Sequence, residues 1–271
     1  AVNVDGTFEN TNGGGTVDGT GTLTAGEIIG NIGPGLQVVS ALYLIASGSW
    51  DNPANWSTSE GGAPCNCTPD ASHYIYLSGY DLSLNDDYEA NTLELAADAK
   101  ITLMPGASLQ LHNTLQLDGE LVLESSASEH AQLLDNGSIT GTGNTIIYKT
   151  ISGGSYHYIS SPLASANSTL FATDGANPNP NFYYYDESAP GASGDWMEGW
   201  QPALDYNGNI MVPGLGYAYY FPSQQKIKFA GGMPSTGTIT QTVTQSNSGN
   251  SSDGWNLIGN PYPSADRKSV V

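Results

Sequence analysis

The chain is poor in positive charge. Its 271 residues include only 6 Lys and Arg against 26 Asp and Glu, which gives a formal net charge of -20. A surface of that sign repels phosphate backbones, so we expect no nucleic-acid partner. Charged residues of all kinds make up only 12% of the chain, while 38% of it is hydrophobic. That apolar share argues against intrinsic disorder.

The sequence also lacks long apolar runs and helical periodicity. No run is long enough to span a membrane and no signal peptide is present, which indicates a processed or excised piece of an extracellular protein. Gly (34 residues) and Pro (15 residues) are frequent, and Thr, Ser and Asn occur in every segment. This composition favours strands and turns. The sequence therefore predicts an all-β fold.

Cysteine is scarce as well, with only Cys65 and Cys67, one residue apart. This spacing leaves three alternatives open: a small local disulfide, two free thiols, or two ligands of a metal site. A structural zinc site needs four ligands, and His73 is the only further candidate nearby. A local structural role is the favoured interpretation.

Between residues 91 and 150, apolar residues fall at every second position in short bursts, a pattern typical of strands. The pairs are Leu93 and Leu95, Ile101 and Leu103, Leu109 and Leu111, Leu115 and Leu117, and Leu121 and Leu123. Each burst is too short to bury a core alone, and corners such as Asp118-Gly119 separate them. Stacked coils solve this problem, so we predict a right-handed parallel β-helix, a β-solenoid, over residues 46–150.

The residues before this segment resemble it. Val2–Phe8 aligns with Leu115–Leu121, so residues 1–45 are predicted to be the terminal coils of a preceding solenoid repeat followed by a linker. Trp50 and Trp56 flank an Asn-Pro turn. We expect them to cap the apolar end of the first coil; the alternative is a surface platform for sugar stacking.

Aromatic residues become frequent after residue 150, and Tyr156–Pro162 aligns with Trp255–Pro261. Residues 151–265 are predicted to form a β-sandwich-like domain of about seven strands. Residues 266–271 contain the only Arg of the chain and match the translation of a common sequencing adapter. We predict that this tail is not native; a resequenced gene that still encodes Arg267 and Lys268 would refute that.

Several of these motifs together resemble modular secreted surface proteins of the type IX secretion kind. They are the Trp-x5-Trp segment, the Leu-rich coils with Gly-Ser-Ile-Thr-Gly-Thr-Gly, Tyr-His-Tyr-Ile-Ser-Ser-Pro, and Gly-Trp-Asn-Leu-Ile-Gly-Asn-Pro-Tyr-Pro. The resemblance implies an extracellular or outer-surface location and a larger protein with a C-terminal sorting domain. Its motifs describe architecture and imply no catalytic residue.

Exposed aromatic residues of the second domain are the candidate glycan-binding groups, although they would equally suit a core. We select Trp196, Trp200, Tyr184, Tyr217 and Tyr219. Loop oxygen ligands also suggest calcium, although turns without metal are the commoner explanation. The candidate ligands are Asp205, Asn207, Asn209 and Asp186.

Catalysis is the less favoured interpretation. A β-helix lyase or hydrolase needs converging carboxylates, for which Glu94, Glu120 and Glu124 are the candidates, but a solvated polar face explains them more simply. No Gly-x-Ser-x-Gly elbow or phosphate-binding loop occurs. The sequence thus predicts a non-catalytic structural or adhesive module of a larger bacterial surface protein. The alternatives are a carbohydrate-binding module, with an extracellular polysaccharide or cell-surface glycan as partner and possible help from calcium, and a polysaccharide-active β-helix enzyme.

Overall fold

The fold is known from a computed structural model that describes residues 2–9, 21–29, 36–135, 137–171, 181–189, 198–203, 210–246 and 253–264. Two compact units form, one from residues 1–123 and 131–144 and the other from residues 124–130 and 145–271. The described residues form strands and two short 3-10 helices, η1 (Pro53–Asn55) and η2 (Ser168–Phe171). None of these helices is long and apolar enough to cross a membrane. The all-β prediction is confirmed.

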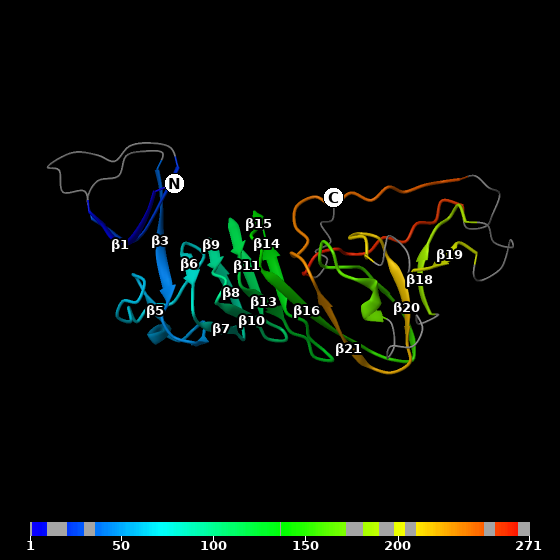
Figure 1. Ribbon diagram of the computed structural model, residues 1–271, viewed down its shortest axis with the longest axis horizontal. Helices are drawn as coiled ribbons and strands as arrows, with labels where there is room; N and C mark the ends of the chain where they lie inside the picture. The colour runs from blue at the N-terminus through cyan, green and yellow to red at the C-terminus, as the bar shows by residue number, and fades with distance from the viewer. Residues whose placement is uncertain are drawn as a thin grey trace. The chain divides into compact units, whose positions relative to one another are not determined.

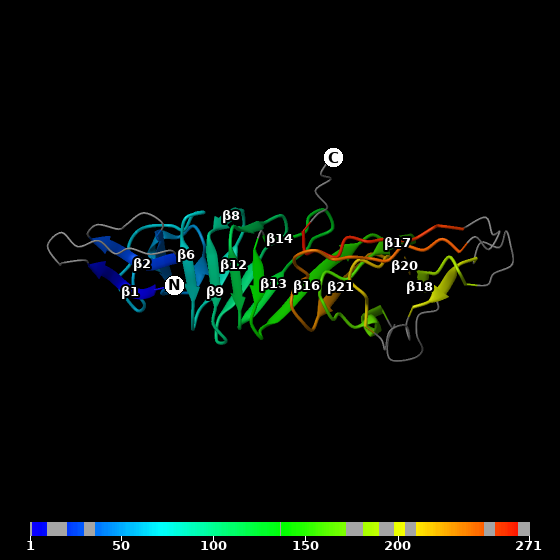
Figure 2. The same cartoon turned by 90° about the horizontal axis from the view of Figure 1, so that it is seen from above.

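The first unit is a β-solenoid with three complete coils between residues 74 and 135, each of which contributes one strand to each of three parallel sheets (Figure 1). The first sheet contains β1 (Val2–Glu9), β2 (Gly21–Ile29), β3 (Leu36–Leu44), β6 (Tyr74–Leu77), β9 (Thr92–Leu95), β12 (Thr114–Leu117) and β15 (Ser138–Thr140). The second contains β4 (Gly48–Ser49), β7 (Asp81–Leu84), β10 (Lys100–Leu103) and β13 (Glu120–Leu123). The third contains β8 (Asp87–Ala90), β11 (Ser108–Leu111) and β14 (Gln132–Asp135). The stacked strands are seen from above in Figure 2.

Four-residue strands with alternating burial explain why the coils stack in register. In β10, Ile101 and Leu103 are fully buried, whereas Lys100 and Thr102 are only half-buried. Leu103 lies between Leu84 of β7 and Leu123 of β13 in the parallel ladder. Because successive strand residues point to opposite faces, a Leu at the same position of each coil forms one continuous apolar column.

The corners between strands require small or capping residues. A Cβ atom on Gly119 would collide with the carbonyl oxygens of Ala96 and Ala99, so only glycine fits there. Beside it, Asp118 Oδ1 accepts a hydrogen bond from the amide of Thr142 in the next coil over 2.9 Å. The Asp-Gly corner seen in the sequence therefore joins neighbouring coils as well as turning the chain.

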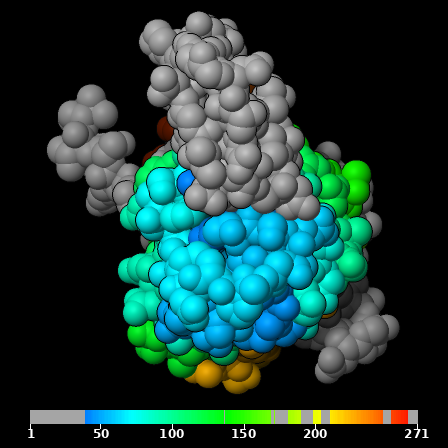
Figure 3. Space-filling view, turned by 90° about the vertical axis from the view of Figure 1, so that its left-hand side faces the viewer, coloured from blue at the N-terminus to red at the C-terminus, as the bar shows by residue number. Residues whose placement is uncertain are grey.

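Two indoles lie at the start of the coils. Trp50 and Trp56 are 1% and 0% exposed, and Trp56 Nε1 donates a hydrogen bond to the Trp50 carbonyl over 2.8 Å. They pack inside the fold, so the alternative of a surface sugar platform was wrong for this pair. Outside the grey atoms, Figure 3 shows this end of the unit as a continuous surface of blue and cyan atoms rather than an open bore.

Further strands precede the Trp pair. β1 and β2 run parallel to each other and β2 to β3, and β5 (Trp56–Ser57) pairs antiparallel with β3. The parallel sheet thus extends back to Val2. That residues 1–45 are the end of a preceding repeat stays a prediction, as do the other predicted domain boundaries; the predicted non-native tail lies outside the described residues.

The second unit contains antiparallel pairs. One sheet has the order β17 (Ser155–Ile159), β20 (Tyr217–Phe221), β18 (Phe182–Tyr185) and β19 (Trp200–Pro202). In addition, β16 (Asn144–Ile151) pairs antiparallel with β21 (Gln225–Ala230), and we call this pair the β16–β21 ribbon. Phe171 of η2 contacts rings from both, with centroids 4.7 Å from Phe182 and 6.1 Å from Phe229. These elements do not confirm the predicted β-sandwich.

Candidate functional site

One face of the antiparallel sheet in the second unit carries aromatic residues that reach solvent. The register places Tyr156 opposite Tyr220, and Tyr158 opposite Ala218. It also places Tyr183 opposite Ala218, and Tyr185 opposite Trp200. Because strand residues alternate between faces, these positions share one side. We call the set of six rings the aromatic face: Tyr156, Tyr158, Tyr183, Tyr185, Trp200 and Tyr220.

The opposite side of the same sheet is the core of the unit. Phe182, Tyr217, Tyr219 and Phe221 are each no more than 2% exposed. The Phe182 ring stacks on Tyr217 with centroids 5.4 Å apart. Burial of this side is what directs the aromatic face outward.

Tyr158 and Trp200 are the most regular pair of the aromatic face. Their ring planes lie within 6° of parallel, with centroids 6.4 Å apart, and Tyr158 is 69% exposed. Two strands separate β17 from β19, so at about 4.8 Å per strand their backbones lie about 14 Å apart. The two side chains therefore lean toward each other across the strands between them.

Neighbouring rings hold this pair in place. The Tyr185 ring meets Trp200 edge-on, with centroids 5.2 Å apart and planes at 79°. Tyr156 makes a similar contact with Tyr220 at 5.3 Å. Burial, together with the nearby Tyr183 and Tyr220, raises the pKa of Tyr156 above its ordinary value. Edge-to-face contacts fix ring orientation, which preorganises the surface.

The residues selected from the sequence are distributed over both sides of this sheet. Trp200 belongs to the aromatic face. Tyr217 and Tyr219 are 1% and 2% exposed and face the core, so neither ring is offered to solvent. Tyr184 is half-buried and lies on the core side, opposite Tyr217. Trp196 lies outside the described residues.

Sequence reasoning missed the other five members of the aromatic face. The signal was present, because Tyr156-His157-Tyr158 and Tyr183-Tyr184-Tyr185 each place two rings at alternate positions. Alternation separates the two sides of a strand, but it does not say which side is buried.

The candidate calcium ligands cannot be assembled into a site. Asp205, Asn207 and Asn209 lie outside the described residues. Asp186 Oδ1 accepts hydrogen bonds from the Ser188 amide over 3.0 Å and the Ser188 hydroxyl over 2.7 Å, as in a capped turn. Within the described ranges no group of three or more His, Cys, Asp or Glu side chains is placed to hold a metal ion.

The residue after Asp186 is a buried carboxylate. Glu187 is 2% exposed, and its Oε2 accepts hydrogen bonds from the amide and hydroxyl of Ser246 over 3.0 and 2.8 Å and from the Gly254 amide over 3.3 Å. The backbone donor of Ser246 is the main cause that lowers the pKa of Glu187. Glu187 therefore joins two distant segments as an ionised brace.

The candidate catalytic carboxylates are each engaged separately. Glu94 of β9 accepts a hydrogen bond from the Tyr74 hydroxyl, and Glu120 of β13 pairs with Lys100 over 2.8 Å. These two strands belong to different sheets of the solenoid. Glu124, in the other unit, pairs with Lys226 over 2.5 Å. The described structure does not show the convergence that a glycosidase or lyase needs.

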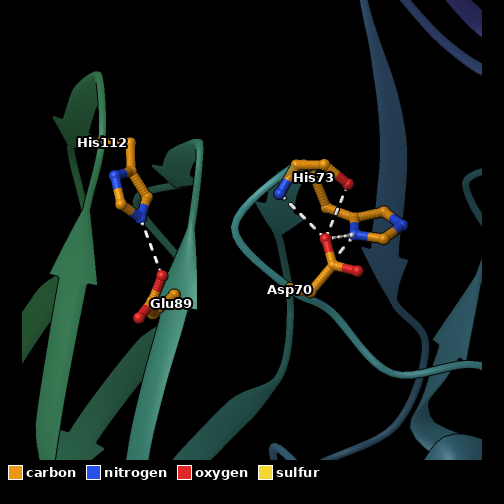
Figure 4. A network of polar contacts seen from close by, with 5 residues as sticks. Asp70, His73, Glu89 and His112 are labelled. Carbon is orange, nitrogen blue, oxygen red and sulfur yellow. Dashed lines mark hydrogen bonds and ion pairs between the residues drawn. The ribbon is translucent and has the colours of Figure 1, made fainter.

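Histidines and cysteines of the first unit also have structural partners. Figure 4 shows two separate pairs, His112 with Glu89 at 2.9 Å and His73 with Asp70 at 2.8 Å. Cys65 and Cys67 form a disulfide. Of the three alternatives for the cysteines, the structure has the local disulfide rather than free thiols or metal ligands. His73 contacts Asp70, three residues before it in the same turn.

Comparison with known proteins gives a family. A family model described as a domain of unknown function (DUF8693) matches residues 45–268. The chain belongs to this family. The matched range includes the solenoid coils from β4 onward and the strands that carry the aromatic face. No curated protein and no solved structure matched the chain.

The DUF8693 match assigns no activity, so the chemistry of the aromatic face has to suggest one. Tyr and Trp rings combine a large apolar surface with a polar tip, and they are rigid compared with aliphatic side chains. Parallel, exposed rings can cover the apolar C–H faces of sugar rings while the sugar hydroxyls stay in water. The site can therefore bind, and it presents no group arranged for bond cleavage among the described residues.

Proposed function

We propose that the chain is a non-catalytic structural and adhesive module of a larger extracellular surface protein, and that it adheres by stacking sugar rings on its aromatic face. The observation that carries this proposal is the exposed Tyr158 ring lying within 6° of parallel to Trp200. Packing in the core accounts for the aromatic residues on the other side of the sheet, because those rings are buried. It does not account for Tyr158, whose ring is exposed.

Two further features support an extracellular location. The Cys65–Cys67 disulfide is a bond that persists in oxidising compartments. The motifs that resemble proteins of the type IX secretion kind imply the same location. In this proposal the solenoid is a spacer, because its coils bury a continuous apolar column and expose polar side chains.

A polysaccharide-cleaving enzyme is the less favoured proposal. Each of the candidate carboxylates has its own partner, and Glu94 and Glu120 lie on different sheets. Calcium-assisted binding stays a prediction, since three of its four candidate ligands lie outside the described residues.

The test is binding of the purified chain to a glycan array and to insoluble polysaccharides, with calcium and again with a chelator. Tyr158→Ala and Trp200→Ala are compared with Tyr80→Ala, which removes a 39% exposed ring from the other unit. Loss of one stacked ring costs about 1 kcal/mol, or roughly fivefold in Kd. We expect Tyr158→Ala and Trp200→Ala to weaken binding by this factor and Tyr80→Ala to leave it unchanged. Retention on no glycan, or retention that neither substitution affects, would rule the proposal out.

A further inference from the structure

A cavity of about 470 Å³ opens beside Tyr158 in the second unit. Its described lining includes His130, Lys149, Tyr158 and Ser160 and contains no Asp or Glu. The chain as a whole has 26 acidic residues and only 6 Lys and Arg. The described lining of this cavity has the opposite balance, with two basic side chains and no carboxylate. This local charge calls for an explanation.

Lys149 emerges from the apolar side of the β16–β21 ribbon. It lies opposite Ile227, and its neighbours on the same side include Ile147 and Phe229, which are 0% and 1% exposed. Burial lowers the pKa of Lys149. A charged amine in such surroundings is unfavourable unless an anion accompanies it.

No carboxylate of the described residues supplies that anion. In the described ranges, lysine side chains form ion pairs between Lys100 and Glu120 and between Lys226 and Glu124. His130 lies close enough to Lys149 for the two to repel, and burial together with this repulsion lowers the pKa of His130. A neutral His130 can still donate one ring N–H. The cavity therefore combines one cation, one neutral donor and the Ser160 hydroxyl.

We propose that this cavity binds the carboxylate of an acidic sugar residue through Lys149, while the ring of that sugar lies against Tyr158. The inference rests on the proposed glycan-binding function and specifies its ligand class. Tyr158 is the link, because it both lines the cavity and belongs to the aromatic face. An amine with an adjacent exposed ring matches a uronic acid, which carries its charge at the edge of an otherwise stackable ring.

The overall charge of -20 opposes the approach of any polyanion, so the attraction is local. At 0.15 M ionic strength the Debye length is about 8 Å, which screens distant carboxylates far more than a contact inside the cavity. Binding should therefore be measured at or above this ionic strength, where repulsion by the rest of the surface is weakest.

The test compares oligogalacturonate with the same oligomer as its methyl ester by titration calorimetry on the full chain. The two probes share the sugar ring and differ only at the carboxyl group, which is a charged carboxylate in one and a neutral methyl ester in the other. We expect wild-type protein to prefer the acid form. Because a charge-assisted hydrogen bond contributes about 1.5–3 kcal/mol, Lys149→Met should weaken binding of the acid by about tenfold or more and that of the ester less than twofold. A sulfated oligosaccharide included as a third probe should bind more weakly than the acid.

Lys228→Met is the matched control, because it removes the same charge from an exposed position opposite Tyr148, on the other side of the ribbon. It should change neither affinity by more than twofold. Lys149→Met should not lower the unfolding temperature, since it replaces a desolvated cation by an apolar chain of similar length. Equal binding of acid and ester by wild type, stronger binding of the sulfated probe, or equal loss in both lysine variants would overturn the inference while leaving glycan binding intact. Binding of no probe would remove the proposed function together with it.

Discussion

Truncation of one leucine in the middle of the solenoid tests the apolar column directly. Leu103 is 0% exposed and lies between Leu84 and Leu123, which are also 0% exposed. Leu→Ala substitutions in cores cost about 2–5 kcal/mol, and the cost is larger where the surroundings cannot collapse. Backbone ladders hold the neighbouring coils about 4.8 Å apart. We therefore expect Leu103→Ala to lower the free energy of unfolding by about 3–4 kcal/mol.

Thr102→Ala is the internal control for this substitution. Thr102 is the preceding residue of β10, points outward and is only half-buried. Its replacement removes a β-branched side chain and should cost less than about 1 kcal/mol. Both variants keep the strand, the corners and the net charge, so the difference between them isolates burial.

The assay is equilibrium unfolding in urea followed by far-ultraviolet circular dichroism. If the two units unfold in separate transitions, the one to analyse is the transition in which the buried Trp50 and Trp56 of the first unit become exposed, as reported by tryptophan fluorescence. If Leu103→Ala costs no more than Thr102→Ala, the side chain does not face a packed interior and the assigned register is wrong.

Three further predictions concern carboxylates and the disulfide. Ionised Glu187 stabilises the fold because its pKa is lowered from the ordinary 4.5, so this stability is present above pH 4.5 and is lost as the pH falls through the folded value. Glu187→Gln should be less stable than wild type at pH 7 in urea unfolding and should lose less on acidification; an identical pH profile would contradict the brace. Hydrogen bonds from Gln116 and Thr142 lower the pKa of Asp118 from 3.8. The free energy of unfolding of the solenoid should therefore depend less on pH in the acid range when Asp118 is replaced by Asn. An unchanged pH dependence would argue against the hydrogen bonds at this corner. Reduction of Cys65–Cys67 opens only a very short loop and should cost at most about 2 kcal/mol, leaving the circular dichroism spectrum of the coils intact; loss of the spectrum would show that the bond is essential.

The predictability of the two units differs for a physical reason. In the coils, an apolar residue at every second position fixes which side of each strand is buried, because the other side is polar. The Leu pairs from Leu93 to Leu123 therefore identified the solenoid and its inward residues correctly. In the second unit both sides of β17, β18 and β20 carry aromatic rings, so alternation gave two equivalent sets.

Tertiary contacts made the choice between those sets. Phe171, from a 3-10 helix outside this sheet, packs on Phe182 and Tyr219 and so buries their side of the sheet. Tyr217 and Tyr219 consequently became core residues, whereas Tyr158 is exposed and Trp200 is half-buried on the other side. Lys149 and Tyr158, on the successive strands β16 and β17, line one cavity, although neither residue type by itself predicts that cavity.

The sequence by itself determined the all-β class, the stacked coils, their Leu column and the Asp-Gly corners. Each of these follows from local periodicity and from residues that suit only certain backbone conformations. Only the tertiary structure decided which aromatic rings reach solvent, which carboxylates are braces and where an unaccompanied lysine meets an exposed ring. They depend on how separate strands and loops pack together, and no local pattern records which of two similar faces another segment will cover.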